Sequence, residues 1–161
     1  MKRILFAALA MAFLLPGAAQ AQDEDFGTVI LDVGELLFVD ITVGDNQTLT
    51  PTLTDFNNSY IDANQLTIST KGNTAHDLFI RGDAGTWSYN PNGSGNSDPS
   101  KPVDDLSYQL AGGSGYTGLT TANQTVDNLS AGQNTVNVDL RVALDYDTDV
   151  EGIYTLDYTV Q

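Results

Sequence analysis

The chain of 161 residues contains no cysteine and a single histidine, His76. Disulfide staples, cysteine nucleophiles and zinc sites built from cysteine and histidine are therefore excluded. A Ser-His-Asp triad would have to use His76, which falls on the apolar register of the stretch 75–82 and is interpreted as a structural residue. Phosphate-binding GxxxxGK[ST] and metalloprotease HExxH motifs are also missing. No spacing among the acids singles out a hydrolytic carboxylate pair, so we expect a protein that is not an enzyme.

Basic residues are scarce as well. The chain has six Lys and Arg against 21 Asp and Glu, and two of the six are Lys2 and Arg3 at the very start. Without these two, the formal charge is 4 − 21 = −17. Nucleic acids and anionic lipids need basic patches, so neither is expected as a partner. Cations or a basic surface partner would relieve the charge.

Long apolar runs are limited to one short segment near the N-terminus. Residues 4–15 are apolar, follow Lys2 and Arg3, and precede the small-x-small motif Ala19-Gln20-Ala21. A membrane-spanning helix needs roughly 20 apolar residues, whereas this pattern is typical of a cleaved secretory signal. We therefore predict a signal peptide at 1–21 and one mature domain at 22–161. The mature domain is expected in the periplasm, at the cell surface or outside the cell, without membrane insertion and with no required cofactor.

Helical periodicity is weak after residue 21, whereas apolar residues recur at every second position. This alternation is typical of strands with one buried face, and turn residues separate the segments. The sequence predicts an all-β protein, an antiparallel Ig-like β-sandwich of about eight or nine strands. The strand segments are 27–33, 36–43, 47–54, 65–72, 75–82, 86–90, 103–110, 135–146 and 152–160, with a weaker one at 124–129.

Acidic residues alternate near the C-terminus, at Asp145, Asp147, Asp149 and Glu151. Their spacing matches the first ligands of an EF-hand loop. That loop also needs glycine at its sixth position and glutamate at its twelfth, where this chain has valine and leucine. An EF-hand is therefore excluded. The favoured interpretation is the acidic tip of a β-hairpin, and a Ca²⁺ site of another kind is the alternative.

Three aromatic residues lie beside the two glycine-rich loops, at Trp87, Tyr89 and Tyr116. Aromatic rings next to mobile loops can stack on sugars, so these residues are candidates for a carbohydrate site. Packing in the core is the competing explanation for Trp87.

The mature N-terminus carries a charged arm, residues 22–25, directly before an alternating strand with Val29, Leu31 and Val33. Such a strand can pair within its own sandwich, or it can add to the open edge of a neighbouring copy. Pairing within its own sandwich is the favoured interpretation. Addition to a neighbour is a route to self-assembly, and it would use Val29, Leu31 and Val33 as its apolar contacts.

The last strand has the form G-x-Y-x-x-x-Y-T, from Gly152 to Thr159, and it follows the segments 27–33 and 140–146. This order of features resembles secreted bacterial surface domains of the spore-coat-U and fimbrial-subunit type, although the usual cysteine pair is absent. The resemblance implies an Ig-like structural or adhesive subunit of a cell-surface layer, pilus or matrix fibre, with no enzymatic activity. The alternative is a secreted module that binds carbohydrate or calcium.

Overall fold

A computed structural model describes residues 31–161. The expected signal peptide at 1–21 and Val29 lie outside the described residues. The chain divides into two compact units, Met1–Val33 and Gly34–Gln161, and every named strand belongs to the second. In residues 31–161, no helix is long and apolar enough to cross a membrane.

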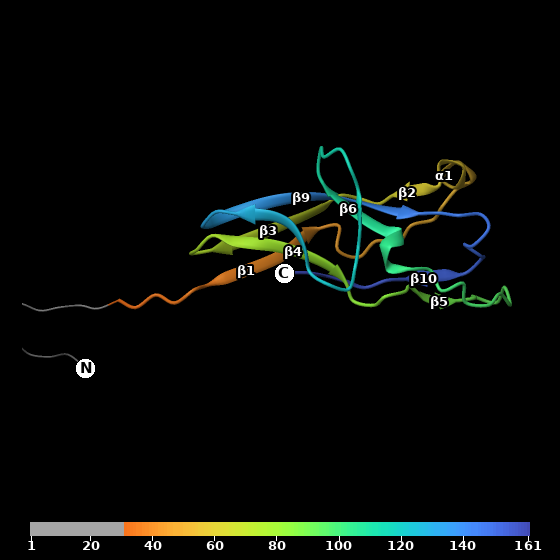
Figure 1. The fold of residues 1–161 in the computed structure, drawn as a ribbon, viewed down its shortest axis with the longest axis horizontal. Helices are drawn as coiled ribbons and strands as arrows, with labels where there is room; N and C mark the ends of the chain where they lie inside the picture. The colour runs from red at the N-terminus through yellow and green to blue at the C-terminus, as the bar shows by residue number, and fades with distance from the viewer. Residues whose placement is uncertain (1–30) are drawn as a thin grey trace, which may run out of the picture. The chain divides into compact units, whose positions relative to one another are not determined.

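The described part of the chain is nearly all β (Figure 1). It contains eleven strands, one short α-helix and one 3₁₀ turn at Val103–Asp105. The strands and the helix, in chain order, are β1 (Leu37–Val43), α1 (Leu53–Asn58), β2 (Tyr60–Asp62), β3 (Leu66–Gly72), β4 (His76–Gly82), β5 (Ser88–Asn90), β6 (Leu106–Leu110), β7 (Thr117–Gly118), β8 (Gln124–Leu129), β9 (Gly132–Ala143), β10 (Ile153–Thr155) and β11 (Tyr158–Val160).

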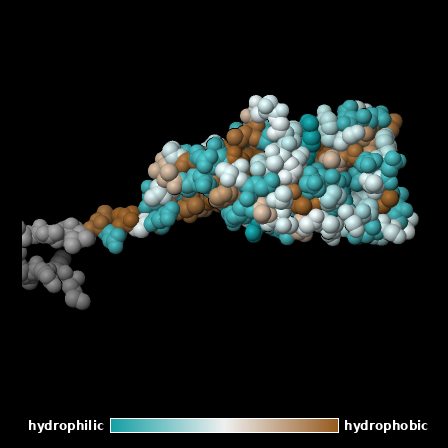
Figure 2. Space-filling model, viewed as in Figure 1, coloured by the Kyte–Doolittle hydropathy of each residue, from teal (hydrophilic) through white to brown (hydrophobic). Residues whose placement is uncertain are grey.

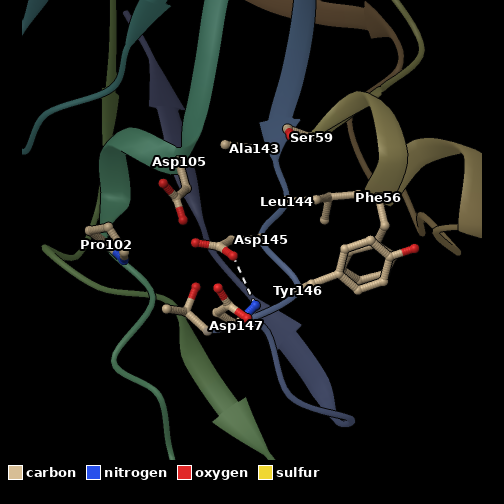
Figure 3. Close-up of a pocket in the computed structure, with 10 residues that line it drawn as sticks. Phe56, Ser59, Pro102, Asp105, Ala143, Leu144, Asp145, Tyr146 and Asp147 are labelled. Carbon is tan, nitrogen blue, oxygen red and sulfur yellow. Dashed lines mark hydrogen bonds between the residues drawn. The ribbon is translucent and has the colours of Figure 1, made fainter.

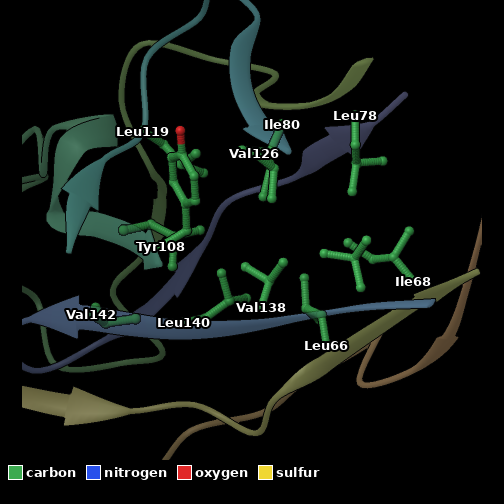
Figure 4. Packing of buried hydrophobic residues seen from close by; sticks show 12 residues of the cluster. Leu66, Ile68, Leu78, Ile80, Tyr108, Leu119, Val126, Val138, Leu140 and Val142 are labelled. Atoms are coloured by element: carbon green, nitrogen blue, oxygen red, sulfur yellow. The ribbon is translucent and has the colours of Figure 1, made fainter. Parts of the chain in front are cut away.

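The strands form three antiparallel sheets. The largest has the order β1-β3-β9-β6-β7, with β2 paired to the end of β9. A second sheet has the order β11-β4-β8, and a third pairs β10 with β5. Apolar side chains of the two larger sheets meet in one core (Figure 4). The structure confirms the all-β antiparallel sandwich, with two or three more strands than the sequence predicts.

Alternation along β3 and β9 builds the centre of this core. The register places Leu66 opposite Val138 and Ile68 opposite Val136, and all four side chains are buried. Successive strand residues point to opposite faces, so the residues between them form the outer face of the sheet. The buried hydroxyl of Thr70 lies 3.0 Å from Nε2 of His76. His76 is thus a hydrogen-bonded residue at the start of β4, which agrees with its structural interpretation.

One predicted strand is wrong, and another is described only in part. The described part of 27–33, residues 31–33, lies in no strand. The segment 47–54 contains no strand either, and its last residues begin α1. Thr52 caps this helix, because its side chain accepts a hydrogen bond from the Asp55 N–H while the Asp55 carboxylate accepts one from the Thr52 N–H. This reciprocal capping box starts a helix and outweighs the apolar alternation around Pro51.

The predicted terminal hairpin is also wrong. The segment 152–160 forms two strands, and neither of them pairs with β9. β10 pairs with β5 and β11 pairs with β4. β9 is already flanked on both sides, by β3 and then β2 along one side and by β6 along the other. Residues 144–152 are therefore a loop that leads from one sheet to another and not the tip of a hairpin.

Candidate functional site

The acidic loop at 144–152 surrounds the ammonium group of Lys101. Nζ lies 2.8 and 2.9 Å from the two carboxylate oxygens of Asp149, 2.9 Å from Asp105 Oδ2 and 2.8 Å from the carbonyl oxygen of Ala143. The side chains of Lys101 and Asp149 are only 5% and 8% exposed. The three protons of the ammonium group therefore face three acceptor groups. The positive charge among these acids is therefore that of the Lys101 side chain.

The carboxylates of Asp145 and Asp149 also accept hydrogen bonds from the backbone of the loop. Asp145 Oδ1 accepts a hydrogen bond from the Asp147 N–H at 2.8 Å, and Asp149 Oδ2 accepts one from the Asp145 N–H at 3.0 Å. The Asp149 N–H donates in turn to the Asp145 carbonyl at 2.8 Å. Aspartate side chains commonly accept a hydrogen bond from the backbone N–H two residues later in the chain. Asp145 and Asp149 thus shape the turn.

Glu151 contributes through its backbone. Its carbonyl oxygen accepts hydrogen bonds from Tyr89 Oη at 2.7 Å, Ser94 Oγ at 3.0 Å and Asn96 Nδ2 at 3.2 Å. Together with the ion pair of Lys101, these bonds join the polar loop 91–102 to the acidic loop 144–152. The two loops form one paired unit, which we call the loop clamp (residues 91–102 and 144–152).

The predicted metal ligands do not form a coordination shell. Among residues 31–161, no group of three or more His, Asp or Glu side chains has the arrangement to hold a metal ion. Asp149 binds Lys101, and Asp145 bonds to backbone. The sequence interpretation missed Lys101, although a lone base inside a polar loop of such an acidic chain was an available signal.

An open pocket of about 700 Å³ lies beside the loop clamp (Figure 3). Asp105, Asp145 and Asp147 point into one side of it, and the rings of Phe56 and Tyr146 form the other side. The two rings stack with their centroids 4.7 Å apart. Phe56 comes from α1, so the capping of this helix places the aromatic wall.

The three predicted stacking residues occupy different parts of the sandwich. Trp87 packs against the core, and its indole Nε1 is buried without a hydrogen-bond partner. Tyr89 on β5 lies 5.1 Å, centroid to centroid, from Tyr154 on β10. Tyr116 lies in the loop before β7, with its ring 4.2 Å from the guanidinium carbon of Arg141. The structure does not bring the three together on one surface.

Arg141 lies on the outer face of the large sheet between two rings. Its guanidinium carbon is 3.6 Å from the ring centroid of Tyr60 and 4.2 Å from that of Tyr116. Nε and a terminal nitrogen of the guanidinium also donate to the two carboxylate oxygens of Asp62, at 2.7 and 3.2 Å. The hydrogen bond to Asp62 raises the pKa of Arg141 above its usual value. Burial, followed by the Asp62 charge, raises the pKa of Tyr116.

The free edge of the large sheet is β1. It pairs with β3 on one side, and none of the described strands pairs with its other side. Phe38 is 57% exposed on the outer face, and Leu37 and Val43 are exposed as well. The space-filling view shows hydrophobic surface along β1 beside largely hydrophilic surroundings (Figure 2). Within β1 only Asp40 carries a charge.

The predicted assembly segment is described only in part. Leu31 and Val33 are 83% and 59% exposed and belong to no strand. The backbone that follows is fixed at Leu36, whose N–H donates to Asn73 Oδ1 at 2.8 Å and whose carbonyl accepts from the Asn73 N–H at 3.2 Å. The described apolar residues of this segment therefore remain available for contact with another molecule.

Comparisons with protein-family models, curated proteins and solved structures returned no match to this chain. The resemblance to spore-coat-U and fimbrial-subunit domains stays a prediction. Function therefore has to be argued from the geometry alone.

Proposed function

We propose that this chain is an exported, non-enzymatic structural subunit that builds a cell-surface layer, pilus or matrix fibre by adding strands between copies. The observation that carries the proposal is the outer edge of β1, to which no strand in residues 31–161 pairs; β1 is a seven-residue strand with exposed Leu37, Phe38 and Val43. Soluble proteins usually blunt such an edge with charges, prolines or a covering segment, because it pairs readily with another chain.

The other sheet edges are shorter or more polar. β7 at the opposite end of the large sheet has two residues, and β11 has three. β8 carries Asp127 and Asn128 in its six residues. β1 is the edge with the length and the apolar surface to bind a strand of a partner. The backbone groups on its outer side would be paired by such a strand.

The donor in this proposal is the segment 27–33 of a second copy. Val29, Leu31 and Val33 alternate along it, so their side chains would share one face of the added strand. Leu31 and Val33 are exposed in the subunit. Donation from one copy to the next uses two different surfaces, so the contact does not close on itself and generates filaments.

Charge sets the conditions under which copies associate. The chain has a formal net charge of −15, so two copies repel each other at low ionic strength. Salt shortens the Debye length to about 10 Å at 0.1 M and to about 3 Å at 1 M. We expect assembly to strengthen with salt. An interface held by surface ion pairs would weaken instead.

The experiment compares the mature protein with an edge variant, Phe38→Lys with Val43→Lys, by size-exclusion chromatography with light scattering over a series of concentrations. Added lysines on an edge strand oppose strand pairing, so the variant should stay monomeric where the parent forms larger species. The matched control is Leu53→Lys, because Leu53 is 71% exposed on α1, away from the edge. A parent that stays monomeric at every concentration and salt condition would refute the proposal.

Deletion of residues 22–33 tests the donor separately. The buried core residues lie between Leu66 and Leu144, and the residues packed against them lie between Val39 and Val160. The deletion removes none of them, so the shortened chain should fold and remain monomeric. It should bind a peptide of sequence QDEDFGTVILDV, and a scrambled peptide is the control. Failure of this peptide to bind, combined with assembly of the shortened chain, would show that another segment makes the contact.

A further inference from the structure

Lys101 is a buried amine in direct contact with two carboxylates. The proposed assembly does not use this contact. Nζ lies 2.8 and 2.9 Å from the two oxygens of Asp149, at the edge of the carboxylate. A rotation of the carboxylate about its Cβ–Cγ bond would present the face of the carboxyl carbon to this nitrogen. Asp105 Oδ2 lies 2.9 Å from the same nitrogen atom. Reacting atoms held at about 3–3.5 Å with fixed orientation gain a large rate advantage over free groups.

We propose that Lys101 and Asp149 form an amide crosslink in the folded protein, with Asp105 as the catalytic acid and base. This modification is independent of assembly, since all of its groups belong to one subunit. It would be a covalent crosslink between the two loops of the loop clamp, in a chain that has no cysteine for a disulfide.

The reaction is a condensation that releases one water. Nζ first passes one proton to Oδ1 of Asp149, which leaves a neutral amine beside a neutral carboxyl group. The amine lone pair then attacks the carboxyl carbon while the Asp105 carboxylate accepts a second proton from the nitrogen. The bond from the carbon to Oδ1 breaks, and Asp105 returns its proton to the departing hydroxyl. The third proton stays on the amide nitrogen, no group is oxidised or reduced, and Asp105 is regenerated.

The surroundings supply what this condensation needs. The Asp145 N–H donates to Asp149 Oδ2 at 3.0 Å, and this oxygen carries the negative charge of the tetrahedral intermediate. A positioned backbone N–H at such an oxygen is a common source of transition-state stabilisation. The Ala143 carbonyl at 2.8 Å orients the amine. The low exposure of Lys101 and Asp149 keeps bulk water away from the reacting atoms.

Asp105 differs from the other acids of the pocket because it alone, besides Asp149, contacts Nζ. Proton transfer by a positioned carboxylate contributes typically 10²–10⁴-fold to a rate. Asp147 lines the same pocket without an ion pair to Lys101. The pair Asp105 and Asp147 thus offers a matched comparison between a catalytic acid and a neighbour of the same charge.

The test is the mass of the folded full chain after overnight incubation and then denaturation. The crosslinked protein should be lighter than its sequence by one water. Trypsin cuts after Arg81 and Arg141 but not at Lys101, which precedes Pro102. The peptides 82–141 and 142–161 should therefore be recovered joined. This joined peptide distinguishes the crosslink from cyclisation of an aspartate, which also releases water. Recovery of two separate peptides at their sequence masses would overturn the proposal and leave a hydrogen-bonded ion pair.

Variants assign the roles. Lys101→Arg should give the full sequence mass, because a guanidinium does not form this amide. Asp105→Asn should keep the reacting pair yet slow the reaction by about 10²–10⁴-fold, so it should remain unlinked when the parent is complete. Asp147→Asn should crosslink like the parent. A joined peptide in Lys101→Arg, or equal rates in Asp105→Asn and the parent, would contradict these assignments.

Discussion

Replacing Arg141 by alanine should destabilise the sandwich, although this residue lies on the outer face of its sheet. The guanidinium is held by two tyrosine rings and by both carboxylate oxygens of Asp62. An exposed cation–π contact contributes about 0.5–1 kcal/mol, and an exposed ion pair about 0.2–1 kcal/mol. The side chains of Arg141 and Asp62 are 28% and 53% exposed, so the lower parts of these ranges apply. We expect a loss of about 1–2 kcal/mol.

The assay is urea unfolding followed by fluorescence, with two reference variants. Leu140→Ala, at a core position that is 3% exposed, should cost about 2–5 kcal/mol through lost burial and the cavity left behind. Lys71→Ala, on the same outer face but without an ion pair in the structure, should stay within about 0.5 kcal/mol of the parent. Arg141→Lys should lose less stability than Arg141→Ala but more than Lys71→Ala, because lysine lacks the planar guanidinium group. If Arg141→Ala matched Lys71→Ala, the stacked arrangement would contribute nothing and the reasoning would be refuted.

Three further outcomes follow from the contacts. Asp149→Ala should cost about 1.5–3 kcal/mol in chemical unfolding, because the buried ammonium group of Lys101 loses its two hydrogen bonds to Asp149 and keeps only Asp105 and the Ala143 carbonyl, whereas Asp147→Ala should be nearly neutral; equal effects would contradict the assigned partners. Millimolar calcium should leave the Tm of the parent unchanged, since Lys101 occupies the acidic loop; a rise in Tm lost in Asp149→Ala would indicate a metal site instead. Burial raises the pKa of Tyr158 above its usual value of 10.0, so the stability that Tyr158 contributes is fully present below about pH 10 and lost as pH rises further. Tyr158→Phe should therefore reduce the alkaline loss of Tm, and an identical loss in the variant would assign the effect to other tyrosines.

Alternation in the sequence was sufficient to predict the centre of the sandwich. From Leu66 to Thr70 in β3 and from Val136 to Val142 in β9, every second residue is a branched apolar side chain or a threonine, and these are the residues that the structure buries. A period of two fixes which face of a strand is covered, so it predicts both the strand and its inner side. The same alternation in β9 puts Arg141, between the buried Leu140 and Val142, on the outer face.

The strand partners and the capped helix were harder to predict from the sequence. The segment 152–160 alternates as predicted, yet the partners of its two halves, β5 and β4, are set by the path of the whole chain. The helix α1 had a readable local signal in Thr52 and Asp55, the pattern of a capping box. The alternation of Leu49, Pro51 and Leu53 concealed it. A short helix with few apolar residues gives little periodicity.

The loop clamp could not be predicted from spacing. Lys101 and Asp149 are 48 residues apart in the chain, and neither belongs to a motif. The acids at every second position from 145 to 151 suggested the tip of a hairpin or a calcium site, whereas the structure places the ammonium group of Lys101 against Asp149. This contact depends on how the two distant loops meet, and no local pattern encodes that.

Negative-stain microscopy of the mature protein in high salt tests the central claim of strand addition most directly. The account predicts filaments or extended chains of particles for the parent and for Leu53→Lys, and single particles for Phe38→Lys with Val43→Lys. Uniform single particles of the parent at high concentration, with or without salt, would contradict it.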